Sequence, residues 1–361
     1  MVDRDDSADL IAQVNAALER AHPLAITGGG SKAFLGRQTD RHGHETLSTV
    51  HHAGIVNYQP TELTLTARAG TPLADIRAAL DEADQALPFE PPALDGAGGT
   101  VATLGGTLAC GLSGQTRPFA GSCRDYVLGV RVINGRGQAL RFGGEVMKNV
   151  AGYDLSRLMV GALGTFGVLL EGSLKVLPKA PVTRSFRAAC SAEEALAFAS
   201  AARRTFSPLS GLAFHGGTLH YRLAGSESAV DACSATLNAR LACDEDTGDH
   251  WTALNEQTLP FFDDTRPLWR LAVPPGTGVL SLPGDTLIDW CGQQRWLLSD
   301  ADADTVQAAA RAAGGHATRF RRGEAHVFQD VPAAHQALLH RLKAAFDPQG
   351  VFNPGRLLDD A

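Results

Sequence analysis

Residues 23–32 read Pro23-Leu24-Ala25-Ile26-Thr27-Gly28-Gly29-Gly30-Ser31-Lys32, a short apolar strand that runs directly into three glycines. Glycine has no Cβ atom, so successive backbone N–H groups of such a loop can turn toward one anion and approach it closely. Gly28, Gly30 and Ala33 also satisfy the Gly-x-Gly-x-x-Gly/Ala pattern of Rossmann dinucleotide folds. The loop therefore indicates a phosphate ligand, with a Rossmann fold as the first interpretation to test.

The residues after the glycines do not suit a Rossmann fold. That fold needs an amphipathic helix directly after the loop, because the phosphate sits on the N-terminus of that helix. Residues 36–44 are polar and have no apolar stripe. For this loop alone, an ordinary glycine turn remains an equal alternative.

A second glycine-rich region lies between residues 96 and 167. It is too apolar and too varied for a flexible linker, and it indicates many close backbone approaches. The glycine-rich pieces at 98–106 and 109–114 are followed by residues 117–125, 148–155 and 161–168. Two separated glycine loops favour one long ligand over two unrelated turns.

The surrounding patterns predict an α+β chain with a domain boundary near residue 180. We expect a helix over 7–20, a strand over 62–70, and a helix over 73–83 that has Thr71 as its N-cap and Pro72 in its first turn. Strands are expected over 126–134, 138–142 and 168–177. Beyond the boundary, glycine thins out and a ferredoxin-like α+β layer is expected: helix 191–204, strand 211–224, helix 226–242, strands 268–273 and 286–298, and helix 301–313. A helix over 332–346 precedes a tight turn, Phe346-Asp347-Pro348-Gln349-Gly350-Val351-Phe352-Asn353-Pro354-Gly355-Arg356, against which other parts of the chain should pack.

The ordered set of glycine loops, together with Phe346-Asp347-Pro348 and Asn353-Pro354-Gly355, resembles the vanillyl-alcohol-oxidase/p-cresol-methylhydroxylase (PCMH) family of FAD-binding proteins. Residues 147–158 and Leu112-Ser113-Gly114 are most similar to the small flavin subunits of bacterial glycolate oxidases. The resemblance covers most of the chain. It implies a two-subdomain PCMH-type FAD-binding domain at 1–180, a ferredoxin-like cap domain at 181–330, and a C-terminal segment at 331–361 that returns to the flavin. A more distant resemblance, to an NADPH-dependent cell-wall reductase with the same type of FAD domain, fits the C-terminal turn and residues 148–158 less well.

By this resemblance, residues 27–32 hold the FAD pyrophosphate, 99–106 and 111–114 line the isoalloxazine and ribityl chain, and 161–168 pass near the adenine half. The residues implied to bind the cofactor are Thr27, Gly28, Gly29, Gly30, Ser31, Lys32, Gly99, Thr100, Thr103, Gly105, Gly106, Gly111, Ser113, Gly114, Asn149, Gly152, Tyr153, Gly164, Thr165, Gly167, Val168 and Asn353. Family members with covalent flavin often carry a His in or near the first loop or an additional Cys in the second. Gly30-Ser31-Lys32 and Gly111-Leu112-Ser113-Gly114 have neither, so noncovalent FAD is expected.

Catalytic residues are harder to assign. Oxidation of a 2-hydroxy acid needs a cation for the carboxylate and a base for the hydroxyl proton. Arg270, Arg319 and Arg322 are weak candidates for the cation, since each has an ordinary structural role as its alternative. Related dehydrogenases have a His-x-Gly-Asp-Gly-Asn-x-His metal motif, from which His215-Gly216-Gly217-Thr218-Leu219-His220 departs, so no metal site is expected and a plain hairpin is favoured.

Composition excludes several other classes of protein. The 361 residues have a formal net charge of −7 and scattered Lys and Arg, which argues against nucleic acid as a partner. No apolar run reaches about 18 residues, and the acidic start does not resemble a signal peptide. The six cysteines are widely spaced and include no Cys-x-x-Cys pair, which indicates buried thiols. Such free thiols suit a cytoplasmic protein. A complex could hold this protein at the surface of the inner membrane.

The resemblance implies an FAD-dependent oxidoreductase subunit of a glycolate oxidase or dehydrogenase complex, which converts glycolate to glyoxylate. The chain would relay electrons beside a large catalytic FAD subunit and an iron–sulfur subunit, or support the large subunit's site. Two alternatives stay open: a self-sufficient FAD-dependent 2-hydroxy-acid dehydrogenase, and a noncatalytic scaffold stabilised by FAD.

Overall fold

The computed structural model describes residues 3–38, 43–96, 99–144, 154–205, 208–321 and 327–358. The chain divides into two compact units. Unit 1 comprises Met1–Ser113, Gly121–Pro178 and Asp330–Ala361, and unit 2 comprises Gly114–Ala120 and Lys179–Gln329. The short segment 114–120 thus leaves the glycine-rich region and belongs to the second unit.

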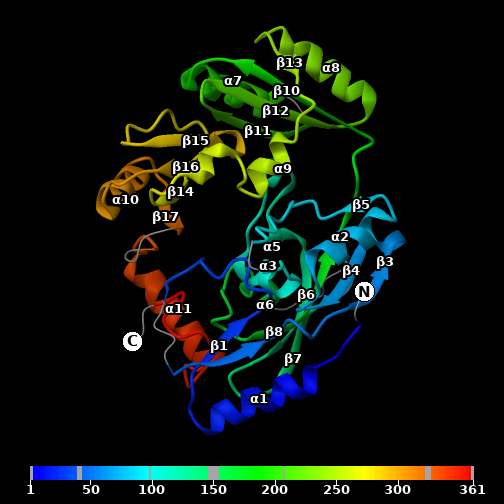
Figure 1. The fold of residues 1–361 in the computed structure, drawn as a ribbon, viewed down its shortest axis with the longest axis vertical. Coiled ribbons are helices and arrows are strands. Elements are labelled where there is room, and N and C mark those ends of the chain that lie inside the picture. The colour runs from blue at the N-terminus through cyan, green and yellow to red at the C-terminus, as the bar shows by residue number, and fades with distance from the viewer. Residues whose placement is uncertain are drawn as a thin grey trace. The chain divides into compact units, whose positions relative to one another are not determined.

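Unit 1 is built from helices and short strands around an antiparallel sheet (Figure 1). Its elements are α1 (Ser7–Glu19), β1 (Leu24–Thr27), β2 (Glu45–Ser48), β3 (Ile55–Gln59), β4 (Thr64–Arg68), α2 (Leu73–Asp81), β5 (Gln85–Ala86), α3 (Leu104–Cys110), α5 (Cys123–Tyr126), β6 (Val127–Ile133), β7 (Ala139–Gly143), α6 (Leu155–Leu158), β8 (Val168–Lys175), β9 (Leu177–Pro178) and α11 (Ala333–Phe346).

The five-stranded sheet of unit 1 has the order β3-β4-β8-β6-β7, and β1 and β2 form a separate parallel pair. Helix α1 buries Leu10, Val14 and Ala17 against a core that includes β1 and β8, as its apolar stripe predicts. Strand β4 shows the predicted alternation in sequence, but Thr64 to Ala67 are all buried. It is a central strand covered on both faces, and its threonines are buried as well.

Two local expectations for unit 1 are wrong. Thr71 does not cap α2: the N-cap residue is Pro72, and the Thr71 hydroxyl exchanges hydrogen bonds with the backbone of Gly54. The glycine-rich stretch is also not all loop, because α3 begins at Leu104 with Thr103 as its N-cap. Adjacent glycines disfavour a helix in sequence, yet here tertiary packing overrides that propensity.

The C-terminal turn packs against the first strand, as expected. Phe352 forms a parallel bridge with Leu24, and the tail that follows the red helix α11 lies beside the blue β1 in Figure 1. Asp347 is buried, accepts hydrogen bonds from the backbone N–H groups of Val351 and Phe352, and pairs with the Lys343 ammonium at 2.6 Å. This buried carboxylate holds the turn together.

Unit 2 is a single sheet with helices. Its elements are α4 (Arg117–Ala120), β10 (Val182–Ala189), α7 (Ala192–Thr205), β11 (Leu209–His215), β12 (Thr218–Gly225), α8 (Glu227–Asn238), β13 (Asp244–Glu245), α9 (His250–Asn255), β14 (Leu268–Ala272), β15 (Asp285–Asp289), β16 (Gln294–Leu298), α10 (Ala303–Ala312) and β17 (His316–Arg321), with 3-10 turns η2 (Pro260–Asp263) and η3 (Trp290–Gly292). The strand order is β13-β10-β12-β11-β15-β16-β14-β17.

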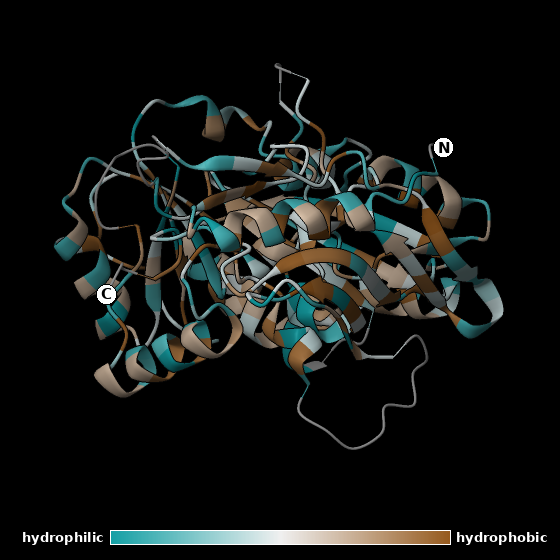
Figure 2. Ribbon diagram, turned by 90° about the horizontal axis from the view of Figure 1, so that it is seen from below, coloured by the Kyte–Doolittle hydropathy of each residue, from teal (hydrophilic) through white to brown (hydrophobic). Residues whose placement is uncertain are grey.

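Two stretches expected as single strands in unit 2 are each two strands joined by a turn, and the first contains the hairpin favoured for residues 215–220. The stretch 211–224 turns at Gly216 and Gly217, both with positive φ, and becomes β11 and β12. The stretch 286–298 breaks at Trp290 and Cys291, whose φ values of 50° and 56° lie in the left-handed region. Bulky residues rarely adopt this conformation, so Trp290 and Cys291 do not predict the break, although Gly292 follows them with a φ of 88°. Helices in Figure 2 show bands of teal and brown, as expected when one face of a helix packs on a sheet.

Candidate functional site

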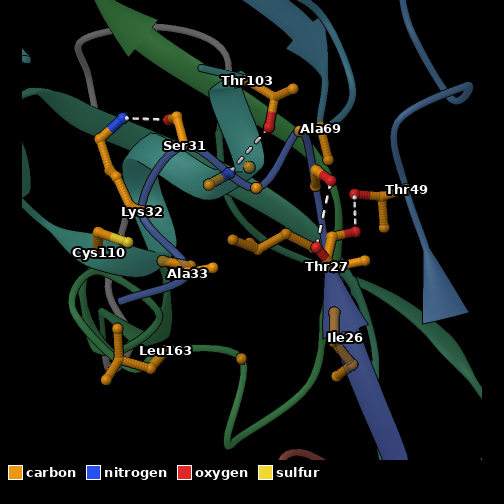
Figure 3. A pocket seen from close by; sticks show the side chains of 18 of the residues that line it. Ile26, Thr27, Ser31, Lys32, Ala33, Thr49, Ala69, Thr103, Cys110 and Leu163 are labelled. Carbon is orange, nitrogen blue, oxygen red and sulfur yellow. Dashed lines mark hydrogen bonds between the residues drawn. The ribbon is translucent and has the colours of Figure 1, made fainter. Parts of the chain in front are cut away.

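One open cleft in unit 1 brings both glycine-rich regions together (Figure 3). Its empty space, counted together with the part that is open to solvent, is about 750 Å³. Its lining consists of Ile26, Thr27, Gly28, Gly29, Gly30, Ser31, Lys32, Ala33, Thr49, Ala69, Val101, Thr103, Gly105, Gly106, Ala109, Cys110, Leu163, Gly164, Gly167, Leu169, Asn353 and Arg356. Residues more than 300 positions apart in sequence therefore share this site.

The first wall of the cleft is the loop after β1. A Cβ atom on Gly28 would lie 2.5 Å from the Thr103 hydroxyl oxygen, and one on Gly29 would lie 1.9 Å from the carbonyl oxygen of Val101. Only glycine fits at these two positions. The amide N–H groups of Gly28 and Gly29 have no acceptor among the described residues. Two such donors beside a cleft suit an anionic ligand.

The second wall is the N-terminal end of α3. The Thr103 side chain caps this helix by accepting a hydrogen bond from the Gly106 amide at 3.3 Å, which Figure 3 shows beside the Gly28–Gly30 loop. Gly105 packs on Ala69, where a Cβ atom would lie 2.8 Å from the Ala69 methyl group. The glycines of α3 therefore permit close packing of this helix on the chain beneath it.

The third wall comes from the C-terminal turn. The Asn353 carboxamide accepts a hydrogen bond from the Ile26 amide at 2.8 Å and donates one to the Leu163 carbonyl at 2.8 Å. Asn353 has φ of 41°, a conformation that asparagine tolerates better than most residues. One side chain thus ties the end of β1 to the loop at Leu163 and Gly164.

The charged groups of the cleft are cationic. Among the lining residues, Lys32 and Arg356 are charged and none is Asp or Glu. The Lys32 ammonium donates to the Ala93 carbonyl at 2.8 Å and to the Ser31 hydroxyl at 3.2 Å. Two buried cations without a lining carboxylate favour a ligand with negative charge, such as a pyrophosphate.

The structure places twelve of the predicted cofactor residues in the lining. They are Thr27, Gly28, Gly29, Gly30, Ser31, Lys32, Thr103, Gly105, Gly106, Gly164, Gly167 and Asn353. Asn149, Gly152 and Tyr153 lie outside the described residues. The remaining seven, Gly99, Thr100, Gly111, Ser113, Gly114, Thr165 and Val168, are not part of the lining.

Local structure accounts for most of these seven. Gly111 ends α3 with φ of 62°, and the Ser113 hydroxyl accepts a hydrogen bond from the Cys123 amide. Thr100 binds the Gly96 amide through its hydroxyl, and Gly99 supplies a positive φ beside it. The other three also have places outside the cleft wall. Val168 is in the core beside α1, Thr165 is buried, and Gly114 belongs to unit 2.

Eight lining residues lie outside the residues and ranges predicted from the sequence: Ile26, Ala33, Thr49, Ala69, Ala109, Cys110, Leu169 and Arg356. Val101 and Leu163 fall within the predicted ranges 99–106 and 161–168, although they were not named singly. Most are small or apolar and resemble ordinary core residues. Arg356 is the exception, because it follows Asn353-Pro354-Gly355 directly in the sequence. Its guanidinium donates to the Leu35 carbonyl at 3.2 Å, and this contact anchors the segment after the first glycine loop.

The catalytic candidates lie in unit 2. Arg270 and Arg319 occupy opposite faces of the sheet, because Arg270 pairs with Thr318 in register and Arg319 pairs with Trp269. Arg319 stacks over the Trp269 ring at 4.7 Å, beside the core under α10. Arg270 and Arg319 therefore cannot bind the same ligand. Arg322 lies outside the described residues.

The histidines of the β11–β12 hairpin make other contacts. The His220 ring binds the Asp246 carboxylate at 2.9 Å and stacks on the His250 ring with centroids 3.6 Å apart. His215 packs against Phe261. Within the described ranges, no group of three or more His, Cys, Asp or Glu side chains could hold a metal ion.

Comparison with known proteins identifies the chain. Residues 2–143 match the family model described as "FAD binding domain". The chain is 48% identical over 353 residues to "Glycolate oxidase subunit GlcE" of Escherichia coli strain K12, which covers 98% of this chain and 97% of that protein. The chain belongs to the GlcE family of glycolate oxidase subunits.

A second relative is similar over a smaller region. "Glycolate oxidase subunit GlcD" of Bacillus subtilis strain 168 is 31% identical over 161 residues, or 45% of this chain and 33% of that protein. The solved structure of p-cresol methylhydroxylase with substrate bound has a TM-score of 0.74 at 15% identity, covering 100% of this chain and 89% of that chain. That likeness confirms the predicted PCMH-type fold.

The family match makes FAD the cofactor of the GlcE-type chain, as the glycine loops predicted. The residues present fit its pyrophosphate: two glycines that a Cβ atom would block, two amides with no acceptor among the residues that the structure describes, and two lining cations. Across the described residues, no helix is long and apolar enough to span a membrane.

Proposed function

We propose that this chain is the FAD-carrying subunit of a complex that oxidises glycolate to glyoxylate, beside a larger catalytic flavin subunit and an iron–sulfur subunit. The observation that carries this proposal is the similarity to a glycolate oxidase subunit over nearly the whole of both chains. The cleft of unit 1 supports it, because the two glycine regions and the C-terminal turn form one anion-binding wall. The cytoplasm is the proposed location.

In this proposal the N-terminal FAD-binding domain spans residues 1–180, the cap spans 181–330, and the segment 331–361 closes the cleft. The loop at Gly28–Lys32 holds the pyrophosphate. FAD bound there supplies two-electron chemistry, and this chain relays electrons within the complex or supports the larger subunit. Asn353, Thr103 and Lys32 position the loop and protect the ligand from solvent.

The flavin is proposed to be noncovalent. Cys110 is the one thiol and no histidine is present among the described lining residues. Burial raises the pKa of the Cys110 thiol, although Lys32 and Arg356 act in the opposite direction. A protonated thiol is a poor nucleophile toward a flavin ring. We therefore expect acid precipitation of the FAD-loaded chain to release all of its yellow colour into the supernatant, whereas a covalent link would leave the colour in the pellet.

The function is tested by an anaerobic titration of the FAD-loaded chain with glycolate, followed by flavin absorbance. We expect no bleaching of the chain alone and bleaching once the partner subunits are added. Bleaching of the chain alone would instead identify a self-sufficient 2-hydroxy-acid dehydrogenase. A flavin that stays oxidised while the assembled complex turns over would identify a noncatalytic scaffold.

A further inference from the structure

Two arginines of unit 2 meet at one indole ring. The guanidinium carbon of Arg117, on α4, lies 4.5 Å from the centroid of the Trp290 ring, and that of Arg270, on β14, lies 4.9 Å from the same centroid. Arg117 comes from the segment 114–120, which joins unit 2 from a distant part of the sequence. The chain thus brings together two cations and one aromatic platform from three separate elements.

Arg270 lies on the sheet face opposite the helix α10. In register, Ala272 pairs with both Gln294 and His316, so these two residues share a face with Arg270. The other face carries Trp269 and Leu271, which pack against Val306 and Ala310 of α10. The face of Arg270 also carries the buried Leu268, Trp296 and Leu298, so Arg270, Gln294 and His316 are polar side chains on a partly apolar face.

Two successive side-chain hydrogen bonds hold Arg270 in position. Its Nε donates to the Gln294 carboxamide oxygen at 2.6 Å, and the Gln294 nitrogen donates to the Asp289 carboxylate at 3.1 Å. Because Nε is used in this way, the two terminal nitrogens are directed elsewhere. The Arg270 guanidinium lies over the Trp290 ring, with Nε as its hydrogen-bonding nitrogen toward Gln294.

The electrostatics of the cluster favour an added anion. Burial and, after it, the charge of the nearby Arg117 lower the pKa of Arg270 to about 10, although Asp289 acts in the opposite direction. Burial raises the pKa of Asp289 to about 7, so this carboxylate is only partly charged at neutral pH. The same two arginines, after burial, lower the pKa of His316. Arg117 and Arg270 therefore act together on the groups around Trp290, with Asp289 as the carboxylate that opposes them.

Trp290 has two unusual features. Its φ of 50° and that of Cys291, 56°, lie in a region that bulky side chains avoid, and such conformations concentrate at functional sites. Its backbone N–H is held by the Asp289 carboxylate at 2.6 Å. The indole is 4% exposed, and its Nε1–H has no hydrogen-bond partner among the described residues. A buried donor without a partner points to a missing acceptor.

We propose that Arg117, Arg270 and the Trp290 indole N–H form a binding site for the carboxylate of a small organic acid. A carboxylate has two oxygens that can accept hydrogen bonds from guanidinium groups and from an indole N–H at the same time. The identity of this acid as a 2-hydroxy acid or its 2-oxo product rests on the proposed function. The carboxylate site itself does not.

The site is tested by isothermal titration of the FAD-loaded chain with glycolate and with oxalate, which has no hydroxyl to oxidise. We expect saturable binding of one acid per chain, accompanied by a change in tryptophan fluorescence. Arg270→Gln and Arg117→Gln should each weaken binding at least tenfold. Arg117 is exposed on a short helix, so its variant tests the site even if Arg270→Gln fails to fold.

Arg311→Gln, on the exposed side of α10, is the matched control and should bind both acids like the unaltered chain. Absence of saturable binding, or equal binding by Arg117→Gln, would overturn the proposal. It would also be overturned if neither acid binds and Arg117→Gln instead prevents assembly with the partner subunits, because the carboxylate would then belong to a partner protein. Oxalate binding does not depend on flavin reduction, so the site can stand even if the proposed function fails.

Discussion

Among the glycines that line the cleft, Gly29 leaves the least space for a Cβ atom. A Cβ atom there would lie 1.9 Å from the Val101 carbonyl oxygen, whereas the Val101 amide already donates to the Gly29 carbonyl at 3.1 Å. Gly29→Ala must therefore push apart the two glycine regions that form the cleft. We expect the variant to retain less than a tenth of the FAD bound by the unaltered chain, measured as flavin per protein after gel filtration.

Gly278→Ala is the matched control for Gly29→Ala, because nothing lies within 4 Å of its Cβ position and its φ is not positive. It should retain full FAD. Equal FAD content in the two variants would show that the Gly29–Val101 contact does not shape the cofactor site.

Single residues also show what the sequence can and cannot predict. The Gly28–Gly30 loop was predictable, since glycine after a strand has few other uses. Ala69, Cys110 and Leu169 were not, because small and apolar residues give the same pattern in a core and in a cleft wall. The Trp290–Cys291 break was partly hidden, since neither residue type favours a positive φ and only the adjacent Gly292 indicates a turn.

At the scale of elements, the C-terminal turn acts as a clamp on β1 and on the loop at Leu163. Asn353→Ala removes both side-chain hydrogen bonds of this clamp and leaves the Ile26 amide and Leu163 carbonyl without that partner. It also places alanine at a φ of 41°, which asparagine tolerates better. We expect the free energy of unfolding to fall by about 3 kcal/mol, measured by urea denaturation, with weaker FAD binding.

Asn57→Ala is the control for this clamp, because the Asn57 side chain accepts only an exposed hydrogen bond from Gln59. Its unfolding midpoint should stay near that of the unaltered chain. If Asn353→Ala unfolds at the same urea concentration as Asn57→Ala, the turn does not stabilise the cleft.

At the scale of the whole molecule, the order of helices and strands was largely predictable, but the grouping of the segments was not. Residues 114–120 and 330–361 each join a unit that is distant in sequence. Apolar periodicity reports which face of an element is buried, and it carries no information on which partner buries it. The Arg117–Trp290 contact follows from that grouping, so no local pattern could reveal it.

The two units also differ in their response to acid. His250, in unit 2, is packed against His220 and lies near Asp246 and His215. Burial, followed by the charge of His220, lowers the pKa of His250 to about 3. In the unfolded chain the pKa of the His250 imidazole has its ordinary value near 6.5. Between pH 3 and pH 6.5 the unfolded state therefore binds more protons than the folded state, and the free energy of unfolding rises with pH. The stabilising contribution is complete above about pH 6.5 and is lost as the pH falls toward 3.

At pH 5 the loss from His250 is about 2 kcal/mol relative to pH 7. His250→Gln removes this titration, so its unfolding free energy, measured in urea at pH 7 and pH 5, should change by less than that of the unaltered chain. His335→Gln, at an exposed position of α11, should retain the full acid sensitivity. An identical loss in all three proteins would mean that acid acts through other groups, such as His52 in unit 1, where burial also lowers the pKa. A loss confined to chains with His250 would instead make the stacked histidine pair the acid-sensitive part of the fold, because unit 1 would keep its FAD cleft at a pH that unfolds unit 2.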